Sequence, residues 1–300
     1  MSVAFCSRPV APSTDGRAML LGLGAVALFS LTLPFTRMAV GDLDPLFLAL
    51  GRAVGAAVLA AAWLAWKRSP LPPRAALLPL SLVAVGCIVG YPLLTSIALR
   101  TVPAAHGAML VGVLPLATTL YAAARGFERP SRGFWAMALL GSCLVVAFAL
   151  VEGDGGLHAA DVLLFAAVLL AAMGYAEGGR LSRSLGGPQT ICWALLLAAP
   201  VLLPVLAWQG LPGAGVGARS WFAFGYVTVM STVVGFFLWY RALALGGVAR
   251  VGQVQLLQPF LSLLGAALLL GETLTLGNCL FALAVAAVVL AGRRMAVHPR

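Results

Sequence analysis

Long apolar runs separated by short polar breaks make up almost all of the 300-residue chain. Each run is about 20 residues long, which is the length of a helix that crosses a bilayer. The breaks carry the glycine, proline and serine residues that are typical of turns. The ten runs cover residues 18–40, 46–66, 75–98, 104–124, 133–151, 160–179, 189–208, 219–240, 248–270 and 275–292. The pattern predicts an all-α membrane protein with ten transmembrane helices and short tails at 1–17 and 293–300.

The composition agrees with this pattern. Hydrophobic residues make up 62% of the chain and charged residues 9%, whereas a soluble domain carries about 25% charged residues. A soluble fold has too much surface for its volume to bury so large an apolar fraction. The first run has about 22 residues, against about 7–15 for the core of a signal peptide. We therefore expect it to remain as the first membrane helix.

Basic residues gather on one side of the expected helices. With a cytoplasmic N-terminus, 15 of the 19 basic residues fall on the cytoplasmic side, Arg100 and Arg219 fall outside, and Arg37 and Arg52 lie within helices. Cytoplasmic loops of membrane proteins are enriched in lysine and arginine. This favours a multi-pass protein of the cell inner membrane with both termini in the cytoplasm. The net charge of +10 then reflects topology, and we expect no nucleic-acid partner.

The two halves of the chain resemble each other at a nearly constant spacing. Each half holds five runs, and because five is odd, the second half enters the membrane from the opposite side. An inverted repeat of this kind is typical of secondary transporters. We predict one repeat over 18–151 and a second over 160–292. The matched pairs include Pro115 and Pro259, Glu128 and Glu272, Gly133 and Gly277 at a shift of 144, and Arg37 and Arg180 at a shift of 143.

These features resemble the drug/metabolite transporter superfamily, and within it the EamA-type transporters. The resemblance is carried by the ten runs, by the proline-to-glutamate spacing in both halves, and by the stretch from Leu238 to Leu243 that leads to Leu270-Gly271-Glu272. It covers residues 18–292 and implies a central cavity between the halves. A tryptophan-glycine pair common in the family is replaced by Leu28-Phe29-Ser30, which removes an aromatic side chain that could line the cavity.

Polar residues on the eighth run are candidates for that cavity. A polar side chain is costly in hydrocarbon unless it faces a cavity or a partner. The alternative is that the hydroxyls bond carbonyls of the preceding turn. In the 144-residue alignment, Cys87 corresponds to Ser231. The candidates are Thr228, Ser231, Thr232 and Trp239 on one helical face, and Tyr91 and Thr95 at corresponding positions of the third run.

Gln255 and Gln258 on the ninth run are further candidates, about 60° apart around a helix. Their first-half equivalents, Val111 and Leu114, are apolar, so the expected cavity is polar on one side only. An amide donates and accepts hydrogen bonds without charge, which suits an uncharged or zwitterionic substrate. The alternative is that the glutamines hold helices together.

Three ionisable residues are candidates for gating or coupling. Arg37 and Arg52 lie near the outer ends of the first two helices, with Asp42 and Asp44 in the loop between them. They either pair with these loop acids as snorkelling cations or form an anion-attracting mouth. Glu177 either pairs locally with Arg180, three residues on, or is a protonatable coupling group.

Pro115 and Pro259 are candidate hinges, because a proline inside a helix removes one backbone hydrogen bond and bends it. Their equivalence in the two halves favours paired bends beside the cavity. Two Gly-x-x-x-Gly pairs, Gly51 with Gly55 and Gly86 with Gly90, predict close helix packing within the bundle.

No enzyme motif, phosphate loop or metal-ligand spacing occurs among the acids, histidines and five cysteines. We expect no catalytic residues, metal or cofactor, and no pumping driven by ATP. The sequence predicts a secondary transporter, an exporter or exchanger, that moves an amino acid, metabolite or drug by alternating access. Its partners are the small-molecule substrate, the lipid bilayer and, if transport is coupled to them, protons. A lipid flippase or passive channel, and a membrane scaffold or sensor, stay open as alternatives, as do the direction and the oligomeric state.

Overall fold

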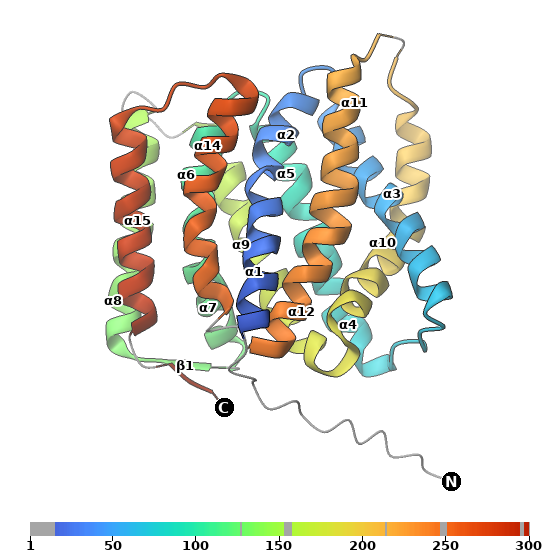
Figure 1. Cartoon of the computed structure of the whole chain (residues 1–300), viewed down its shortest axis with the longest axis horizontal. Coiled ribbons are helices and arrows are strands. Elements are labelled where there is room, and N and C mark those ends of the chain that lie inside the picture. The colour runs from blue at the N-terminus through green and yellow to red at the C-terminus, as the bar shows by residue number, and fades with distance from the viewer. Residues whose placement is uncertain are drawn as a thin grey trace.

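The computed structural model describes residues 16–126, 128–152, 158–213, 215–246, 251–294 and 297–299. These residues form a bundle of helices that lie side by side, with both ends of the chain at the same end of the bundle (Figure 1). The first half contributes α1 (Gly16–Ser30), α2 (Thr32–Ala39), α3 (Pro45–Trp66), α4 (Arg74–Val83), η1 (Ala84–Gly90), α5 (Tyr91–Ala98), α6 (Ala104–Val111), α7 (Leu114–Ala124) and α8 (Arg132–Glu152). The second half contributes α9 (Ala159–Leu185), α10 (Gly187–Gln209), α11 (Ala218–Gly225), η2 (Tyr226–Gly235), α12 (Phe236–Gly246), η3 (Gly252–Leu257), α14 (Gln258–Leu270) and α15 (Leu276–Arg294).

Several of these helices follow one another with little or no break and make longer apolar rods. Within the described residues, seven helical stretches are long and apolar enough to cross a membrane, and the shorter stretches Val254–Leu270 and Leu276–Val288 are also apolar. The stretches beginning at Ala159 and Ala218 continue to Leu185 and Gly246, beyond the ends expected at 179 and 240. Hydropathy follows the bilayer, so it misses helical turns that continue past the hydrocarbon.

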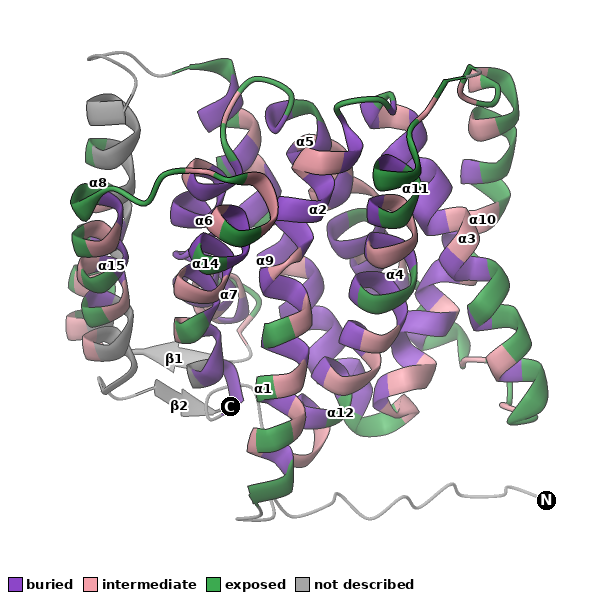
Figure 2. Cartoon of the chain, turned by 45° about the horizontal axis from the view of Figure 1, so that its top comes forward, coloured by how far each residue is buried: buried purple, intermediate pink, exposed green. Residues whose placement is uncertain are grey.

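The outward faces of the bundle are apolar. Val58, Trp66, Val162, Phe222 and Leu268 are each more than 60% exposed, while the faces that helices turn toward one another are buried (Figure 2). Exposed apolar area on this scale marks a surface that contacts something other than water. For helices long enough to cross a bilayer, we expect these exposed apolar faces to contact lipid.

Two of the rods contain π-helical segments, η1 and η2. A π-helical turn is wider than an α-helical turn and is frequent at functional sites. It also changes which residues share a face. The α-helical period expected from Thr228 to Trp239 is not kept in residues 226–235, but Thr228, Ser231, Thr232 and Trp239 are all buried.

Glycines allow the helices to approach closely. A Cβ added at Gly86 would lie 2.3 Å from the carbonyl oxygen of Leu170, and one added at Gly55 would lie 3.0 Å from the Thr228 methyl group. The expectation that both Gly-x-x-x-Gly pairs make contacts inside the bundle is confirmed. The first pair packs toward α11 and η2, and the second toward α9.

The fold is not helical throughout. Strand β1 (Glu128–Pro130) pairs antiparallel with β2 (Val297–Pro299) at the end of the bundle that carries the termini. This short pair of three-residue strands is an addition to a fold whose other described elements are all helical, as expected. It joins the connection between α7 and α8 to the C-terminal tail, beside the contact between α8 and α15 at one edge of the bundle (Figure 1).

Candidate functional site

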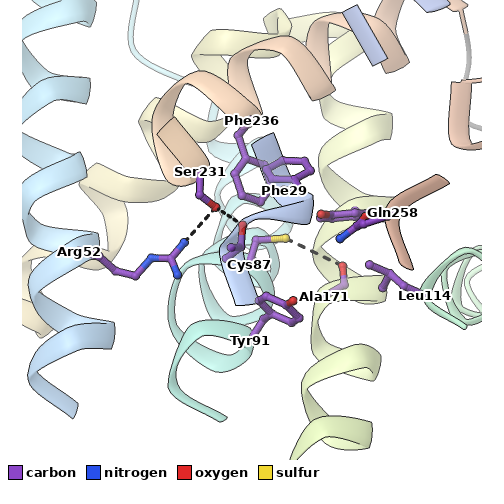
Figure 3. A pocket seen from close by; sticks show the side chains of 11 residues that line it. Phe29, Arg52, Cys87, Tyr91, Leu114, Ala171, Ser231, Phe236 and Gln258 are labelled. Carbon is purple, nitrogen blue, oxygen red and sulfur yellow. Dashed lines mark hydrogen bonds between the residues drawn. The ribbon is translucent and has the colours of Figure 1, made fainter. Parts of the chain in front are cut away.

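A pocket lies between helices from both halves of the chain (Figure 3). The empty space between its lining atoms is about 390 Å³ with the open solvent at its mouth included, but only about 20 Å³ of it can hold the centre of a water molecule. Most of its wall is apolar or aromatic, with a few polar groups, as in most small-molecule sites. It is lined by Phe29, Thr32, Arg52, Cys87, Tyr91, Leu114, Ala171, Tyr175, Ser231, Phe236 and Gln258.

Arg52 brings a positive charge to this wall. It lies on α3, and its side chain is only 3% exposed. Its Nε and Nη2 donate to Thr232 Oγ1 at 3.1 and 2.8 Å, and Nη2 also donates to Ser231 Oγ at 3.4 Å. Its Nη1 has no hydrogen-bond partner among the described residues. The guanidinium thus joins α3 to η2 and keeps one donor group unused.

Aromatic rings form another part of the wall. Phe29 contacts Phe236 with ring centroids 5.1 Å apart, and Tyr175 contacts Phe236 at 6.0 Å. Trp239 packs behind them, 5.6 Å from Tyr175 and 6.3 Å from Phe29. Tilted and edge-on contacts at these distances stabilise an aromatic cluster. The cluster gives the pocket a rigid apolar surface.

Four residues chosen from the sequence lie in the pocket wall: Arg52, Tyr91, Ser231 and Gln258. Ser231 Oγ lies 2.8 Å from Thr32 Oγ1, so the first and eighth predicted helices meet at a pair of hydroxyls. Gln258 begins α14 and is 7% exposed. The pocket therefore brings together side chains that are up to 229 positions apart in the chain.

Three other candidate hydroxyls bond to backbone carbonyls instead. Thr95 Oγ1 donates to Tyr91 O at 2.7 Å, Thr228 Oγ1 to Phe224 O at 2.7 Å, and Thr232 Oγ1 to Val227 O at 2.7 Å. None of these threonines lines the described pocket. Thr232 still acts on the site, because it also accepts two hydrogen bonds from Arg52.

Trp239 and Gln255 are buried and do not line the described pocket. Trp239 is 1% exposed and Gln255 is 4% exposed. In the part of the chain that the structure describes, Trp239 Nε1 and Gln255 Nε2 have no hydrogen-bond partner. A buried donor without a partner costs about 1–3 kcal/mol, so both positions carry a cost that apolar packing alone would avoid.

The expected pairing of the outer arginines with the loop acids is wrong. Arg37 donates to the carbonyl oxygen of Leu99, and Arg52 binds the hydroxyls of η2. Asp44 instead caps α3 and accepts a hydrogen bond from Gln209 at 3.0 Å. Asp42 accepts from Ser220 Oγ at 2.7 Å and from Gly217 N at 3.1 Å. Asp42 and Asp44 therefore bond to residues of the second half, and the hydrogen bonds of Arg37 and Arg52 go to other groups.

We expect Asp42→Asn to destabilise the protein slightly at neutral pH. The Ser220 hydroxyl, followed by the Gly217 amide, lowers the pKa of the Asp42 carboxyl below its ordinary 3.8. A lowered folded-state pKa gives a stabilisation that is complete above the unfolded value and is lost as the pH falls through the folded value. The difference in melting temperature between wild type and variant should be constant from pH 7 to 5 and shrink below pH 4. A difference that grows in acid would contradict this assignment.

Glu177 on α9 is fully buried and lies among three donors. It accepts hydrogen bonds from Arg125 Nε at 3.0 Å, Tyr121 Oη at 3.1 Å and Arg180 Nη2 at 3.4 Å. The local pair with Arg180 is therefore present, but the shorter contacts come from Tyr121 on α7 and from Arg125, which follows the last residue of α7, in the other half. We call Tyr121, Arg125, Glu177 and Arg180 the Glu177 cluster. It ties the halves together at the end of the bundle that carries the termini.

Different groups tie the halves together at the opposite end. Both oxygens of Glu272 accept hydrogen bonds at 2.8 Å, from the backbone N–H groups of Ala104 and Ala105 at the start of α6. A carboxylate at a helix N-terminus is favourable for its charge and for the unpaired N–H groups. His106 Nε2 lies 2.6 Å from Asp161 Oδ1 on α9. With the Asp42 contacts, these bonds join the two halves at that end.

Pro115 and Pro259 occupy the same place in two similar breaks. Each is the second residue of a helix, α7 and α14, that follows a residue outside the regular α-helical pattern. A proline there costs no hydrogen bond, because the first N–H groups of a helix have no partner within it. The prolines follow irregular turns inside the longer helical stretches Ala104–Ala124 and Val254–Leu270, and Leu114 and Gln258 beside them line the pocket.

Sequence reasoning missed several residues of the wall. Phe29, Tyr175 and Phe236 have no polar signal, because an aromatic residue in an apolar run is as compatible with lipid as with a cavity. Phe29 also corrects the expectation that the first helix lacks an aromatic side chain at the cavity. Cys87 and Leu114 had a usable signal, since they align with Ser231 and Gln258. No group of three or more histidine, cysteine or acidic residues among the described residues is arranged to hold a metal ion.

Comparison with known proteins shows to which family this chain is similar. The model of the EamA-like transporter family matches twice, over residues 16–151 and 158–292. The chain is 43% identical over 277 residues to an uncharacterized transporter, YdeK, of Bacillus subtilis (strain 168), covering 92% of this chain and 96% of that protein. A solved crystal structure, described only as that of a protein, superposes with a TM-score of 0.63 at 20% identity, over 94% of this chain and 99% of the other. The chain therefore belongs to the EamA-like transporter family.

Proposed function

We propose that this protein is a secondary transporter, an exporter or exchanger, that moves a small organic molecule across the cell inner membrane by alternating access. The observation that carries the proposal is the pocket between the two halves, with polar contacts joining the halves above and below it. A carrier needs a binding site that is closed in turn from each side. The Glu177 cluster and the Glu272 contacts are suited to these two closures.

The proposal includes ten membrane helices in two inverted repeats. The two separate family matches support it. So do the breaks in the rods: at a shift of 144, η1 falls within η2, and the first residue of α7, Leu114, falls on that of α14, Gln258. The contacts are consistent with a two-fold relation, because α3 packs on α10, α6 on α14 and α8 on α15.

Several residues that line the pocket occupy equivalent positions in the two halves. Cys87 corresponds to Ser231 and Leu114 to Gln258 at a shift of 144, and Thr32 corresponds to Tyr175 at 143. A site lined by equivalent positions lies on the axis between the repeats, where transporters bind their substrates. We place the end with the termini in the cytoplasm, because 15 of the 19 basic residues lie at that side of the expected topology.

Purified protein in liposomes tests the proposal. Uptake of a panel of labelled amino acids, organic acids and amphipathic drugs should exceed uptake by protein-free liposomes for at least one compound, with or without a pH gradient. Unlabelled compound inside the liposomes should accelerate uptake of the labelled one, since a carrier exchanges and a channel does not. Failure of every compound, or flux without this acceleration, would overturn the carrier mechanism. Scrambling of labelled lipid instead would indicate a flippase.

A further inference from the structure

Arg52 is a buried cation without a carboxylate partner. The ion pairs of the described residues involve His106, Arg125, His158 and Arg180, and none involves Arg52. Its bonds go to the neutral hydroxyls of Ser231 and Thr232, and Nη1 has none. Charged residues within membrane segments are costly, usually pair with one another or with backbone carbonyls, and mark the pathways of substrates and ions.

The hydroxyls hold the guanidinium in place but do not balance its charge. Thr232 Oγ1 donates its own proton to Val227 O, so its lone pairs are free to accept from Nε and Nη2. This fixes one edge of the guanidinium plane against η2. Nη1 is left on a side chain that lines the pocket, where Figure 3 shows Arg52 extending from α3 toward Ser231. A guanidinium with a fixed plane and a spare donor is suited to an anion that accepts from it.

The other residues of the pocket wall indicate which kind of anion would fit the pocket. Tyr91 and Gln258 offer uncharged hydrogen-bonding groups, while Phe29, Tyr175, Phe236 and Leu114 are apolar or aromatic. Among the lining residues, Arg52 alone carries a formal charge at neutral pH, so one negative charge is matched and a second would not be. An inorganic ion would leave the aromatic surface without a contact.

We propose that Arg52 binds the carboxylate of the transported substrate, and that the substrates are small organic monocarboxylates, amino acids included, with an apolar or aromatic body. This inference rests on the proposed transport function and names its substrate class. It differs from a purely structural role, in which the Arg52 bonds to Ser231 and Thr232 only hold α3 against η2.

Pairs of compounds that differ only in the carboxylate test it. Purified protein would be titrated with 3-phenylpropionate and L-phenylalanine, with their carboxamides, and with chloride and phosphate, and binding followed by the rise in melting temperature. At least one carboxylate should stabilise the wild type at concentrations where its amide does not. In Arg52→Gln its apparent affinity should fall at least tenfold, with Arg52→Lys less affected. Thr232→Val, which frees the guanidinium, should lower affinity to a smaller degree, and Arg100→Gln, an exposed arginine, should leave it unchanged.

Several results would overturn the inference. They are equal stabilisation by acid and amide, an unchanged affinity in a folded Arg52→Gln, no stabilisation by either carboxylate, or an equal Arg52-dependent shift with chloride or phosphate. If Arg52→Gln does not fold, the acid and amide pairs on the wild type decide the question. Transport in liposomes separates the two proposals: flux of neutral or cationic compounds but of no carboxylate refutes the carboxylate site and leaves a transporter, whereas no flux of any compound refutes transport itself.

Discussion

Replacing Glu177 with glutamine should open the pocket toward the end of the bundle that carries both termini. The Glu177 cluster joins the C-terminal end of α7 in the first half to α9 of the second, and Tyr121, Arg125 and Arg180 all donate to the two oxygens of this carboxylate. A glutamine of the same shape has one acceptor oxygen and no charge. Arg125 and Arg180 would then face each other across a neutral group, and the closed arrangement would lose its main contact.

The expected loss of free energy in the closed state depends on how exposed the Glu177 cluster is to water. Hydrogen bonds to a charged group contribute about 1.5–3 kcal/mol each when well buried, but Arg125 and Arg180 are 45% and 51% exposed, so water weakens their share. A loss of about 2 kcal/mol for the closed state is a reasonable total. That corresponds to about a thirtyfold rise in the ratio of open to closed molecules.

The native thiol of Cys87 provides the measurement. Cys87 lines the pocket and is 4% exposed in this closed arrangement. In a background with the other four cysteines replaced, a membrane-impermeant maleimide added from the termini side should label Cys87 about thirtyfold faster in Glu177→Gln than in the parent. Labelling from the opposite side should not increase. Arg183→Gln, an exposed change on the same helix, is the matched control, and equal labelling rates in all three proteins would mean that the cluster is not a closure.

The positions of the helices are largely readable from the sequence. Apolar runs predicted the stretches at 45–66, 74–98 and 104–124 to within a residue or two, because the length of hydrocarbon sets the length of each run. Alternation of apolar runs and turns does not, however, record the local helical period. The π-helical segments η1 and η2 break the register on which the stripe from Thr228 to Trp239 was built.

Only some of the residues that line the pocket could be predicted from the sequence, because contacts between distant helices leave no local pattern. Tyr91, Ser231 and Gln258 stand out because polar groups are unusual in apolar runs. Arg52 stood out too, but its partners Ser231 and Thr232 lie about 180 positions away, and no local pattern links them. The same holds for Arg125 and Glu177. Contacts between the halves depend on how the helices pack, and that packing is set by glycines and aromatic side chains that look alike in any apolar run.

One such glycine leads to the second large effect: Gly86→Ala should disrupt the packing of η1 against α9. An added Cβ at Gly86 would lie 2.3 Å from Leu170 O and 3.0 Å from Gly174 N, both backbone atoms of α9. Neither can turn aside as a side chain can, so η1 and α9 must separate. Overpacking of this kind costs about 1–3 kcal/mol, and we expect the upper end.

The same substitution at Gly225 should have the opposite effect on the stability of the protein. A Cβ there meets nothing within 4 Å, and alanine is favoured over glycine in a helix by about 1 kcal/mol. Gly86→Ala should therefore lower the melting temperature and the yield of monodisperse protein, while Gly225→Ala leaves both unchanged or slightly raised. Separation of η1 from α9 would also move Cys87 away from Ala171 and Tyr175 across the pocket, so transport should fall even in protein that stays folded. If Gly86→Ala were as stable and active as Gly225→Ala, the close contact that forms this wall of the pocket would be wrong.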